Sequence, residues 1–340
     1  MPETLDIAVV GATGLVGEAL VELLEERDFP VANLYLLASG ESAGKSIGFR
    51  GRNIRVGKLD DFDFAKVRLA FLSVGAEAAA DCAARASEAG CSVIDLSGAS
   101  LNNAAALLAQ ACVNGDAIET LQLPALIAAP VAPAAEVAEV LAALRGVLEL
   151  RQVNVAACLS ASALGREGVQ ELARQTAELL NARPLEPRLV DRQFAFNMLA
   201  QLGGVDERGH SAVERRIAAE LARLFPELEH GLSVTCSVAP VFFGDALMLT
   251  IKAAASVSLP DVSAALEAAD GIELVEDDYP TVIGDAQGQD TVYVGRLRTG
   301  LTDSCELNLW IASDNVRKGA ALNACLLYTS PSPRDQRGYR

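Results

Sequence analysis

The residues best placed to do chemistry lie in a glycine-rich segment near the start of the chain. Gly11, Gly14 and Gly17 are spaced G-x-x-G-x-x-G, directly after the apolar run 5–10 and before leucines at helical spacing. A glycine turn between a buried strand and a helix lets the backbone approach a pyrophosphate that faces the helix N-terminus. The segment predicts a dinucleotide-binding site, although a turn of this kind can persist without a ligand. Its expected residues are Gly11, Thr13, Gly14, Leu15, Val16 and Gly17.

A second candidate loop follows the next expected strand. In a dinucleotide-binding sheet this loop contacts the adenosine ribose, and here it contains Ser39, Glu41 and Ser42. Glu41 can accept a hydrogen bond from a free 2′-hydroxyl, which favours NAD over NADP. A solvated loop glutamate is the alternative interpretation, and both stay open.

Reactive side chains elsewhere are few and scattered. Seven cysteines occur singly, and the two histidines are His210 and His230. An odd cysteine count without a C-x-x-C pair predicts neither a disulfide framework nor a zinc site, so we expect no metal, reduced thiols and a cytoplasmic location. Cys158 falls in an expected strand, where a cysteine is more typical of a core residue than of a nucleophile. His210 precedes the expected helix N-cap Ser211, and His230 is expected to be exposed.

Composition excludes several partners. The 340 residues are 51% hydrophobic and carry 45 acidic against 28 basic side chains, a net charge of −17. Such a charge repels phosphate backbones and anionic lipid, so we expect neither nucleic acid nor membrane as a partner. The chain shows no signal-peptide pattern, and its most apolar stretch, 123–135, is interrupted by three prolines and is too short to cross a bilayer.

The first third alternates between strand and helix patterns. Strands are expected at 5–10, 34–38, 67–73 and 92–96, with helices after the glycine turn and at 76–89. This alternation predicts a parallel sheet of the Rossmann type, an α/β fold. We place the dinucleotide-binding domain at residues 1–127.

The remainder predicts a mixed α+β domain for dimerisation and substrate binding, at 128–313. A helix at 314–325 is expected to return to the first domain. The tail, 326–340, looks like a non-native extension resembling vector read-through, with a natural disordered terminus as the alternative. The strands expected in the second domain are 152–159, 232–241, 247–255, 292–298 and 306–312, and the helices are 165–180, 211–224 and 259–269.

Specific segments carry a family resemblance over residues 5 to 325. They include GATGLVGEAL, LLASGESAGK, SVIDLSGAS, VTCSVAPVFFGD and LNLWIASDNVRKGAALNA, in that order. The chain resembles the aspartate-semialdehyde dehydrogenase family, and within it the Usg-type homologues. The resemblance implies an NAD(P)-binding fold, a homodimer and a role in amino-acid biosynthesis, with NADP or NAD as the cofactor.

The resemblance also implies a chemistry that this chain has mostly lost. In the family a cysteine thiolate attacks an aldehyde, a histidine acts as acid and base, a glutamine orients the intermediate, and arginines bind the carboxylate and the phosphate. We expect thiol-dependent dehydrogenase activity to be absent. An active oxidoreductase on aspartate semialdehyde, or an enzyme that uses Asp245 or Cys158 on another substrate, are the alternatives. In this chain Val131 matches the cysteine, Asp245 the histidine and Leu159 the glutamine. Val238 matches the arginine that binds the carboxylate, and Leu101 matches the arginine that binds the phosphate.

The cofactor side of the family pattern is retained. The pyrophosphate loop, Ser39 and Ser42 match, and Asn323 matches the residue near the nicotinamide. Glu214 and Arg215 match an acidic–basic pair that lines the family's substrate site. We prefer the interpretation that they belong to a solvated helix face, together with Arg216 and Glu220.

Overall fold

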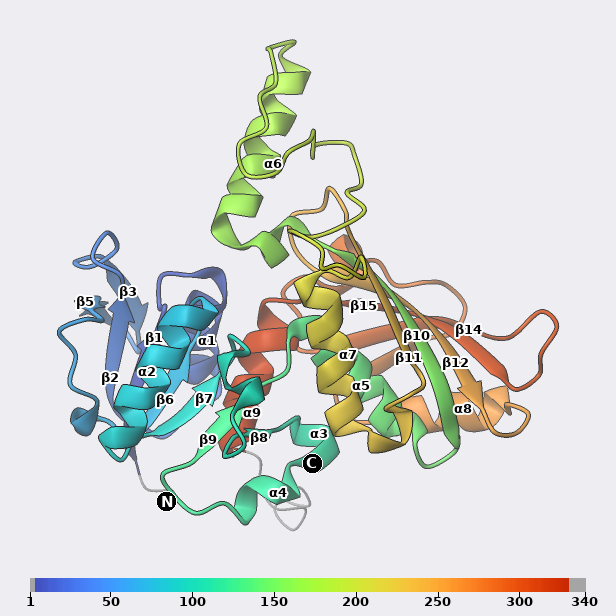
Figure 1. Ribbon diagram of the computed structural model, residues 1–340, viewed down its shortest axis with the longest axis horizontal. Coiled ribbons are helices and arrows are strands. Elements are labelled where there is room, and N and C mark those ends of the chain that lie inside the picture. Colours follow the sequence, from blue (N-terminus) through green and yellow to red (C-terminus); the bar gives the residue numbers. More distant parts are fainter. Residues whose placement is uncertain (1–3, 330–340) are drawn as a thin grey trace. The chain divides into compact units, whose positions relative to one another are not determined.

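The computed structural model describes residues 4–329, which divide into two compact units. The first unit contains the chain up to Val131 and the segment from Ala320 onward, and the second is Ala132–Gly319. The second unit is therefore an insertion between two segments of the first, as the sequence colouring of Figure 1 lets the reader follow. Among the described helices, none is long and apolar enough to span a membrane.

A seven-stranded sheet forms the centre of the first unit (Figure 1). Its order is β5-β2-β1-β6-β7-β9-β8, and every neighbouring pair is parallel. This confirms the predicted Rossmann-type sheet, and it adds the short strands β5, β8 and β9 that the sequence pattern did not reveal. The strands are β1 (Leu5–Val10), β2 (Val31–Ala38), β5 (Gly57–Lys58), β6 (Leu69–Leu72), β7 (Ser92–Asp95), β8 (Leu107–Leu108) and β9 (Leu126–Ala128).

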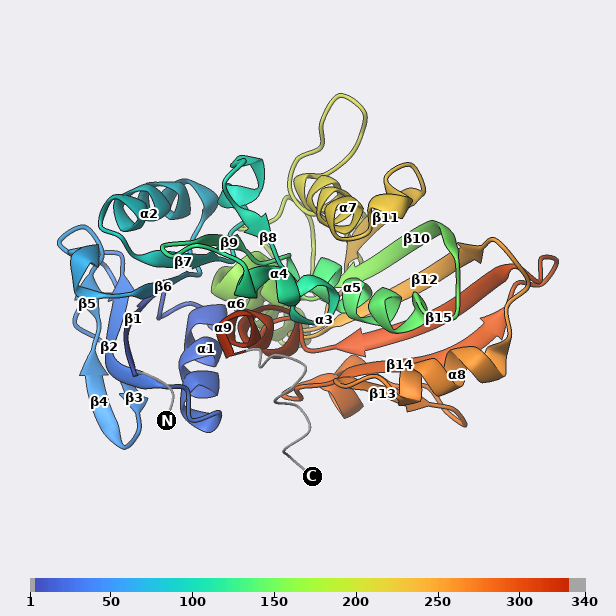
Figure 2. The same cartoon turned by 90° about the horizontal axis from the view of Figure 1, so that it is seen from below.

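Helices cover both faces of this sheet (Figure 2). Alternate side chains of a strand point to opposite faces, so Ile7 and Val9 pack with α1 (Leu15–Glu26) and α9 (Asn323–Thr329). Ala8 and Val10 pack on the other face with α2 (Ala76–Glu88). The shorter elements of the unit are the hairpin β3 (Ser46–Phe49) and β4 (Arg52–Arg55), with η1 (Phe64–Lys66), η2 (Ala99–Asn102), α3 (Ala111–Asn114) and α4 (Asp116–Glu119).

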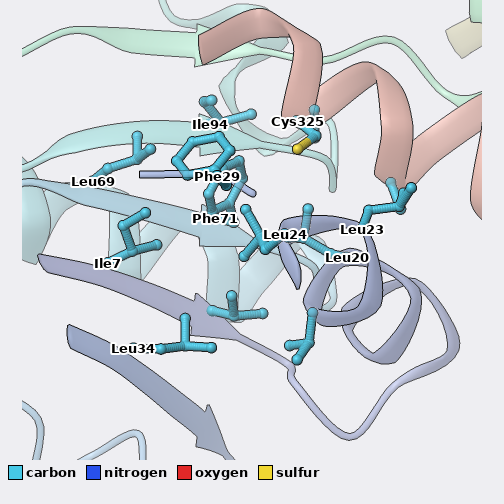
Figure 3. Close-up of a cluster of buried hydrophobic side chains, with 14 of the residues drawn as sticks. Ile7, Leu20, Leu23, Leu24, Phe29, Leu34, Leu69, Phe71, Ile94 and Cys325 are labelled. Atoms are coloured by element: carbon cyan, nitrogen blue, oxygen red, sulfur yellow. The ribbon is translucent and has the colours of Figure 1, made fainter. Parts of the chain in front are cut away.

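The end of the chain contributes to this core. Figure 3 shows Cys325 of α9 beside Phe29, Leu24 and Ile94, and Cys325 is fully buried. The expectation of one helix over 314–325 is wrong: η6 (Arg317–Leu322) is π-helical, and α9 continues to Thr329.

The physical reason for the later helix lies at its start. The side chain of Asp314 accepts hydrogen bonds from the backbone N–H groups of Val316 and Arg317, which holds residues 314–316 in a turn. The beginning of the expected tail belongs to α9, where Leu327 is buried and the Tyr328 ring lies 5.4 Å from the Phe29 ring. Residues 330–340 of that tail lie outside the described part of the chain.

The second unit is built on a six-stranded mixed sheet, ordered β11-β10-β12-β15-β14-β13. β10 pairs parallel with β11 and antiparallel with β12, which confirms the mixed α+β class. The strands are β10 (Leu150–Leu159), β11 (Leu232–Val238), β12 (Asp245–Ala253), β13 (Ile272–Val275), β14 (Val292–Thr299) and β15 (Glu306–Ser313). The helices are α5 (Ala132–Leu144), α6 (Gly165–Leu180), α7 (Ala212–Leu224) and α8 (Leu259–Glu267), with short η3 (Ala161–Leu164), η4 (Pro226–Leu228) and η5 (Val282–Ala286).

Polar groups fix the long segment that follows α6. The Gln175 amide oxygen accepts the backbone N–H groups of Phe194 and Ala195 at 2.7 and 3.2 Å. The Glu171 carboxylate accepts from Gln175, from Arg174 and from the backbone of residue 188. A helix and loop that project from the sheet in Figure 1 are therefore held by buried hydrogen bonds.

The start of α7 is a capping box. The Ser211 hydroxyl accepts from the Glu214 backbone, and the Glu214 carboxylate accepts from the Ser211 backbone at 2.7 Å. We expected Glu214, Arg215, Arg216 and Glu220 to form a solvated helix face. This expectation is wrong for Glu220, which is fully buried and pairs with Arg216 at 2.7 Å. A buried carboxylate that keeps a guanidinium partner belongs to the packed interior rather than to solvent.

Candidate dinucleotide site and substrate-side positions

Close backbone packing dictates the glycine turn of the first unit. Gly11 has φ +84°, and a Cβ there would lie 2.4 Å from the carbonyl oxygen of Ser73. A Cβ on Gly17 would lie 2.2 Å from the carbonyl oxygen of Gly11. Both positions require glycine, which leaves the backbone of the turn open to a bulky anion.

The helix after the turn is oriented for such an anion. Gly14 is the N-cap of α1 and has no side chain to cap it, and Leu15 and Val16 form the first turn of this helix of 12 residues. The N-terminal N–H groups and the helix dipole then favour a negative charge at this point. Ser73, which sequence reasoning did not single out, holds the turn by donating from its hydroxyl to the Val10 carbonyl at 2.9 Å.

Two cations that the sequence analysis did not consider lie at the loop after β2: Lys45 at the end of the loop and Arg55 on β4. Ser39 is exposed, Ser42 is half-buried, and the backbone N–H of Ser42 donates to the Ser39 carbonyl. Lys45 Nζ lies 3.5 Å from the Ser42 hydroxyl, and a Cβ on Gly44 would lie 3.7 Å from a guanidinium nitrogen of Arg55. Arg55 is placed there because the β3–β4 hairpin pairs it with residue 46. Only the unpredicted hairpin brings this charge to the loop.

Glu41 is exposed in the same loop. The predicted preference for NAD rested on this carboxylate alone. Lys45 in the loop and Arg55 in the neighbouring hairpin favour NADP instead, because a positive charge favours a 2′-phosphate.

Asn323, the first residue of α9, has an unsatisfied amide. Its side chain is 4% exposed, and within residues 4–329 neither Nδ2 nor Oδ1 has a hydrogen-bond partner. An unpaired buried amide costs free energy, and a group that offers both a donor and an acceptor would satisfy it.

Three positions that match the family's catalytic and substrate-binding residues come together at one end of neighbouring strands in the second unit's sheet. Leu159 ends β10, Val238 ends β11, and these two residues are register partners. Asp245 begins the neighbouring antiparallel strand β12 and is the register partner of Ser313. The backbone N–H of Ser160 donates to the Asp245 carboxylate at 3.2 Å. Positions that are far apart in the sequence thus form one row across four strands.

The remaining two positions lie in the first unit. Val131 is half-buried and directly precedes α5, whereas Leu101 is half-buried in η2. In the residues that the structure describes, no group of three or more histidine, cysteine, aspartate or glutamate side chains could hold a metal ion.

The other candidate side chains have structural surroundings. Cys158 lies on β10, where the Ser237 hydroxyl donates to its sulfur at 3.5 Å. His210 and His230 are exposed, as predicted for His230. Glu214 is held in the capping box, and although burial raises its pKa, hydrogen bonds from the backbone of Cys236 and Ser211 bring that pKa below its usual value. Arg215 pairs with Asp206 on the surface.

Burial dominates the electrostatics of Asp245. It raises the pKa of this carboxyl to about 7, the Ser160 N–H opposes the rise, and the charge of Asp314 adds to it. The side chain is 1% exposed. A group with this pKa can hold or release a proton near neutrality, but it provides no fixed positive charge for an anionic substrate.

The parallel sheet, the glycine turn and the separate mixed-sheet unit define a two-domain protein built on a dinucleotide-binding fold. The family model described as semialdehyde dehydrogenase, NAD binding domain, matches residues 6–121. The model described as semialdehyde dehydrogenase, dimerisation domain, matches residues 141–318. The chain belongs to the semialdehyde dehydrogenase family.

Similar proteins agree with this assignment over 97% or more of their own length. The chain is 60% identical over 328 residues to a protein named USG-1 protein homolog from Pseudomonas aeruginosa, a match that covers 96% of this chain and 97% of that protein. A solved structure of a probable aspartate-semialdehyde dehydrogenase from Pseudomonas aeruginosa superposes with a TM-score of 0.94 at 59% identity, covering 96% and 98% of the two chains. Aspartate semialdehyde dehydrogenase II from Vibrio cholerae, complexed with ASA, gives a TM-score of 0.93 at 36% identity and covers 99% and 100%.

Proposed function

We propose that this chain binds a nicotinamide dinucleotide but lacks thiol-dependent aldehyde dehydrogenase activity. The main support for this proposal is that Val238, Leu159 and Asp245 lie in one row across neighbouring strands. In an active family member the matching arginine, glutamine and histidine must meet around one substrate. The convergence of the three positions here therefore supports the residue-by-residue match, and none of them keeps the family's side chain.

The chemistry of the row argues against the family's substrate. Aspartate semialdehyde carries a carboxylate, and the family's second substrate is phosphate. The acidic Asp245 and two apolar residues offer these anions no positive partner, and an unpaired anion is costly to desolvate. At the nucleophile position, the side chain of Val131 has no group that can form a covalent adduct.

The cofactor side fits a dinucleotide. Gly11, Gly14 and Gly17 would admit the pyrophosphate at the start of α1, and Ser39 and Ser42 would contact the ribose. Asn323 would pair its buried amide with the carboxamide of the nicotinamide. A bound nicotinamide supplies hydride transfer. In this proposal the chain's own residues bind and orient the dinucleotide without activating an aldehyde.

We further propose a homodimer that uses the open face of the second unit's sheet. Cross-strand register aligns Ala156, Met248 and Trp310 on that face, and Met248 is 42% exposed. Apolar side chains aligned in this way are typical of a surface that a partner covers. The cytoplasmic location expected from the single cysteines stays a prediction.

The second candidate function is an active oxidoreductase on aspartate semialdehyde. The Vibrio cholerae protein that is 36% identical to this chain carries that activity in its name and was solved with ASA. This candidate requires a catalytic group other than the family's thiol and histidine, with Cys158 or, at the histidine's own position, Asp245 as the available side chains.

One pair of measurements tests the proposal. Purified protein is incubated with aspartate semialdehyde, phosphate and NADP while absorbance of the reduced nicotinamide is followed, and NAD and NADP are titrated separately by calorimetry. We expect heat from at least one dinucleotide and no turnover. Turnover would establish the second candidate, and absence of heat with both dinucleotides would overturn the binding half of the proposal.

The binding measurement has a matched control. Asn323→Leu replaces the unpaired amide with an apolar side chain of similar size, and it is expected to weaken dinucleotide binding. Asn181→Leu changes the same residue type in the second unit, at the exposed C-cap of α6, and is expected to leave binding unchanged.

A further inference from the structure

The projecting part of the second unit contains a small pocket that the proposed function does not use. It lies between the first half of α6 and the segment that follows this helix, and both can be followed in Figure 1. The pocket has a volume of about 290 Å³, and its wall includes Glu167, Glu171, Arg174, Arg188 and Leu189. This volume is below the range typical of pockets for drug-sized ligands, so it suits a small metabolite.

A network of charged hydrogen bonds fixes one wall of this pocket. The Arg174 guanidinium donates to the two oxygens of the Glu171 carboxylate at 2.7 and 3.2 Å. Glu171 is 5% exposed, and although burial raises its pKa, hydrogen bonds from Arg174 and Gln175 bring that pKa below its usual value. The same carboxylate accepts the backbone N–H of Arg188 at 3.0 Å, which holds the loop against the helix. The wall is therefore charged and preorganised before any ligand binds.

Two opposite charges at the rim of the pocket are available to a ligand. In the part of the chain that the structure describes, the side chains of Glu167 and Arg188 form no hydrogen bond or ion pair, either with each other or with other groups. Both side chains are exposed. Arg174, by contrast, has no N–H group left, because it also donates to the Glu178 carboxylate and to the carbonyl oxygen of Glu186.

The charges that line the pocket balance. The acids Glu167 and Glu171 stand against the bases Arg174 and Arg188, so the wall is neutral in a chain whose net charge is −17. A simple anion or cation would satisfy one side of such a pocket and be repelled by the other, which disfavours both. A zwitterion satisfies the two free charges at once. Leu189, which is 38% exposed, adds an apolar surface next to Arg188.

We propose that this pocket binds a free α-amino acid in its zwitterionic form. The Arg188 guanidinium receives the α-carboxylate, to which its planar fork of donors is suited, and the Glu167 carboxylate receives the α-ammonium group. An apolar side chain of the amino acid lies against Leu189. All of these residues belong to the second unit, whereas the glycine turn belongs to the first, so the proposal does not depend on whether the chain binds a dinucleotide.

Ligand-detected NMR on the full chain tests the zwitterion requirement with matched probes. L-Leucine carries both charges, 4-methylpentanoate lacks the ammonium group, and 3-methylbutylamine lacks the carboxylate. We expect a saturation-transfer signal from L-leucine and binding of either half-molecule that is about fivefold weaker or more, because each loses one charge-assisted contact at an exposed rim. Absence of L-leucine binding, or equal binding of all these probes, would overturn the proposal.

Substitutions at the rim locate the bound amino acid. Arg188→Gln and Glu167→Gln each remove one free charge, so we expect L-leucine to bind each variant about fivefold more weakly. Arg183→Gln and Glu186→Gln are the matched controls, since they change exposed charges of the same segment that do not line the pocket. Equal binding by the rim and control variants would place L-leucine elsewhere on the protein and rule out this site.

A second readout follows from the position of the ligand. Because the amino acid bridges α6 and residue 188, saturating L-leucine is expected to slow chymotryptic cleavage within residues 181–199. Chymotrypsin does not cut after arginine, so the same assay serves Arg188→Gln, in which this protection should be lost. Cleavage that L-leucine leaves unchanged in the unsubstituted protein, or protection that persists in Arg188→Gln, would contradict the proposed contacts.

Discussion

Leu159 and Val238 are register partners at the carboxyl ends of the parallel strands β10 and β11, and both side chains are buried. Two apolar residues in contact with the protein interior make this edge of the sheet a stable, unreactive surface. A single substitution cannot turn it into a site that binds anions, because each polar group that is introduced needs partners of its own.

Restoring only the nucleophile is therefore expected to fail. Val131→Cys provides a thiol, but the orienting amide and the acid–base group are still replaced by Leu159 and Asp245, and the two arginines by Val238 and Leu101. Residues that act as a unit lose most of the rate enhancement when any one is missing. We expect no reduction of NADP with aspartate semialdehyde and phosphate in a spectrophotometric assay. Val131→Ser serves as the control for added polarity, and measurable turnover by Val131→Cys alone would contradict the proposed loss.

A methyl group in the glycine turn should destabilise the first unit. Gly11→Ala combines φ +84° with a Cβ 2.4 Å from a backbone oxygen. Such strain costs about 1–3 kcal/mol, and the shifted turn should also weaken dinucleotide binding. Chemical denaturation and calorimetry measure the two effects. Gly40→Ala is the matched control, since no heavy atom lies within 4 Å of its added Cβ, and equal stability of the two variants would refute the prediction.

Cofactor preference should depend on the cations beside the ribose loop. Lys45→Gln and Arg55→Gln are expected to weaken NADP binding by roughly 0.5–1 kcal/mol each and to leave NAD nearly unchanged, because exposed charge pairs are weak and only NADP has a 2′-phosphate. Glu41→Gln should shift preference the other way. Calorimetric titrations at low salt measure these differences. The prediction is wrong if both cation variants affect NAD and NADP equally.

The hydrogen bonds of Gln175 should hold the segment after α6. Gln175→Leu leaves the backbone N–H groups of Phe194 and Ala195 without their buried acceptor. Each unsatisfied group costs about 1–3 kcal/mol, enough to open the segment locally. Limited proteolysis should then cut within residues 181–199 faster than in the unsubstituted protein. Gln170→Leu, on the same helix, is the control, and equal cleavage rates in the two variants would contradict the role given to Gln175.

The buried ion pair between Lys318 and Glu139 should show strong coupling. Lys318→Met leaves a buried carboxylate without its cation and is expected to cost about 3–5 kcal/mol. Combining it with Glu139→Met removes both charges, and the double variant should recover most of this loss. Denaturant unfolding of the four proteins gives the coupling free energy. Additive effects of the two single changes would show that the pair does not act as a unit.

The first unit was predictable because its signals are local. Within one short stretch of sequence, the apolar run of β1 is followed by the spaced glycines and then by the leucines of α1. The β3–β4 hairpin lacks such a signal, since its strands are short and mostly exposed. Missing the hairpin also hid the position of Arg55, so Glu41 was the only charge weighed for cofactor preference.

The acidic interior of the second unit could not be foreseen. Glu136 and Glu139 interrupt an apolar helix at positions that a sequence pattern normally assigns to solvent. Their burial depends on β12, β15 and the turn around Gly319, all more than a hundred residues further along the chain. The row of Leu159, Val238 and Asp245 likewise depends on strand register, which side-chain periodicity within single strands does not specify.

The contribution of α9 to the first unit has a consequence for synthesis. Cys325 and Leu327 complete a core whose other members, such as Phe29 and Ile94, emerge from the ribosome hundreds of residues earlier. Until the inserted unit has been translated, α1 covers this sheet face without α9, and part of the apolar surface of the nascent first unit stays exposed. A chaperone that shields exposed apolar surface would find its longest-lived target at the amino-terminal sheet, and a ribosome stalled before α9 would present a chain whose second unit can fold before its first.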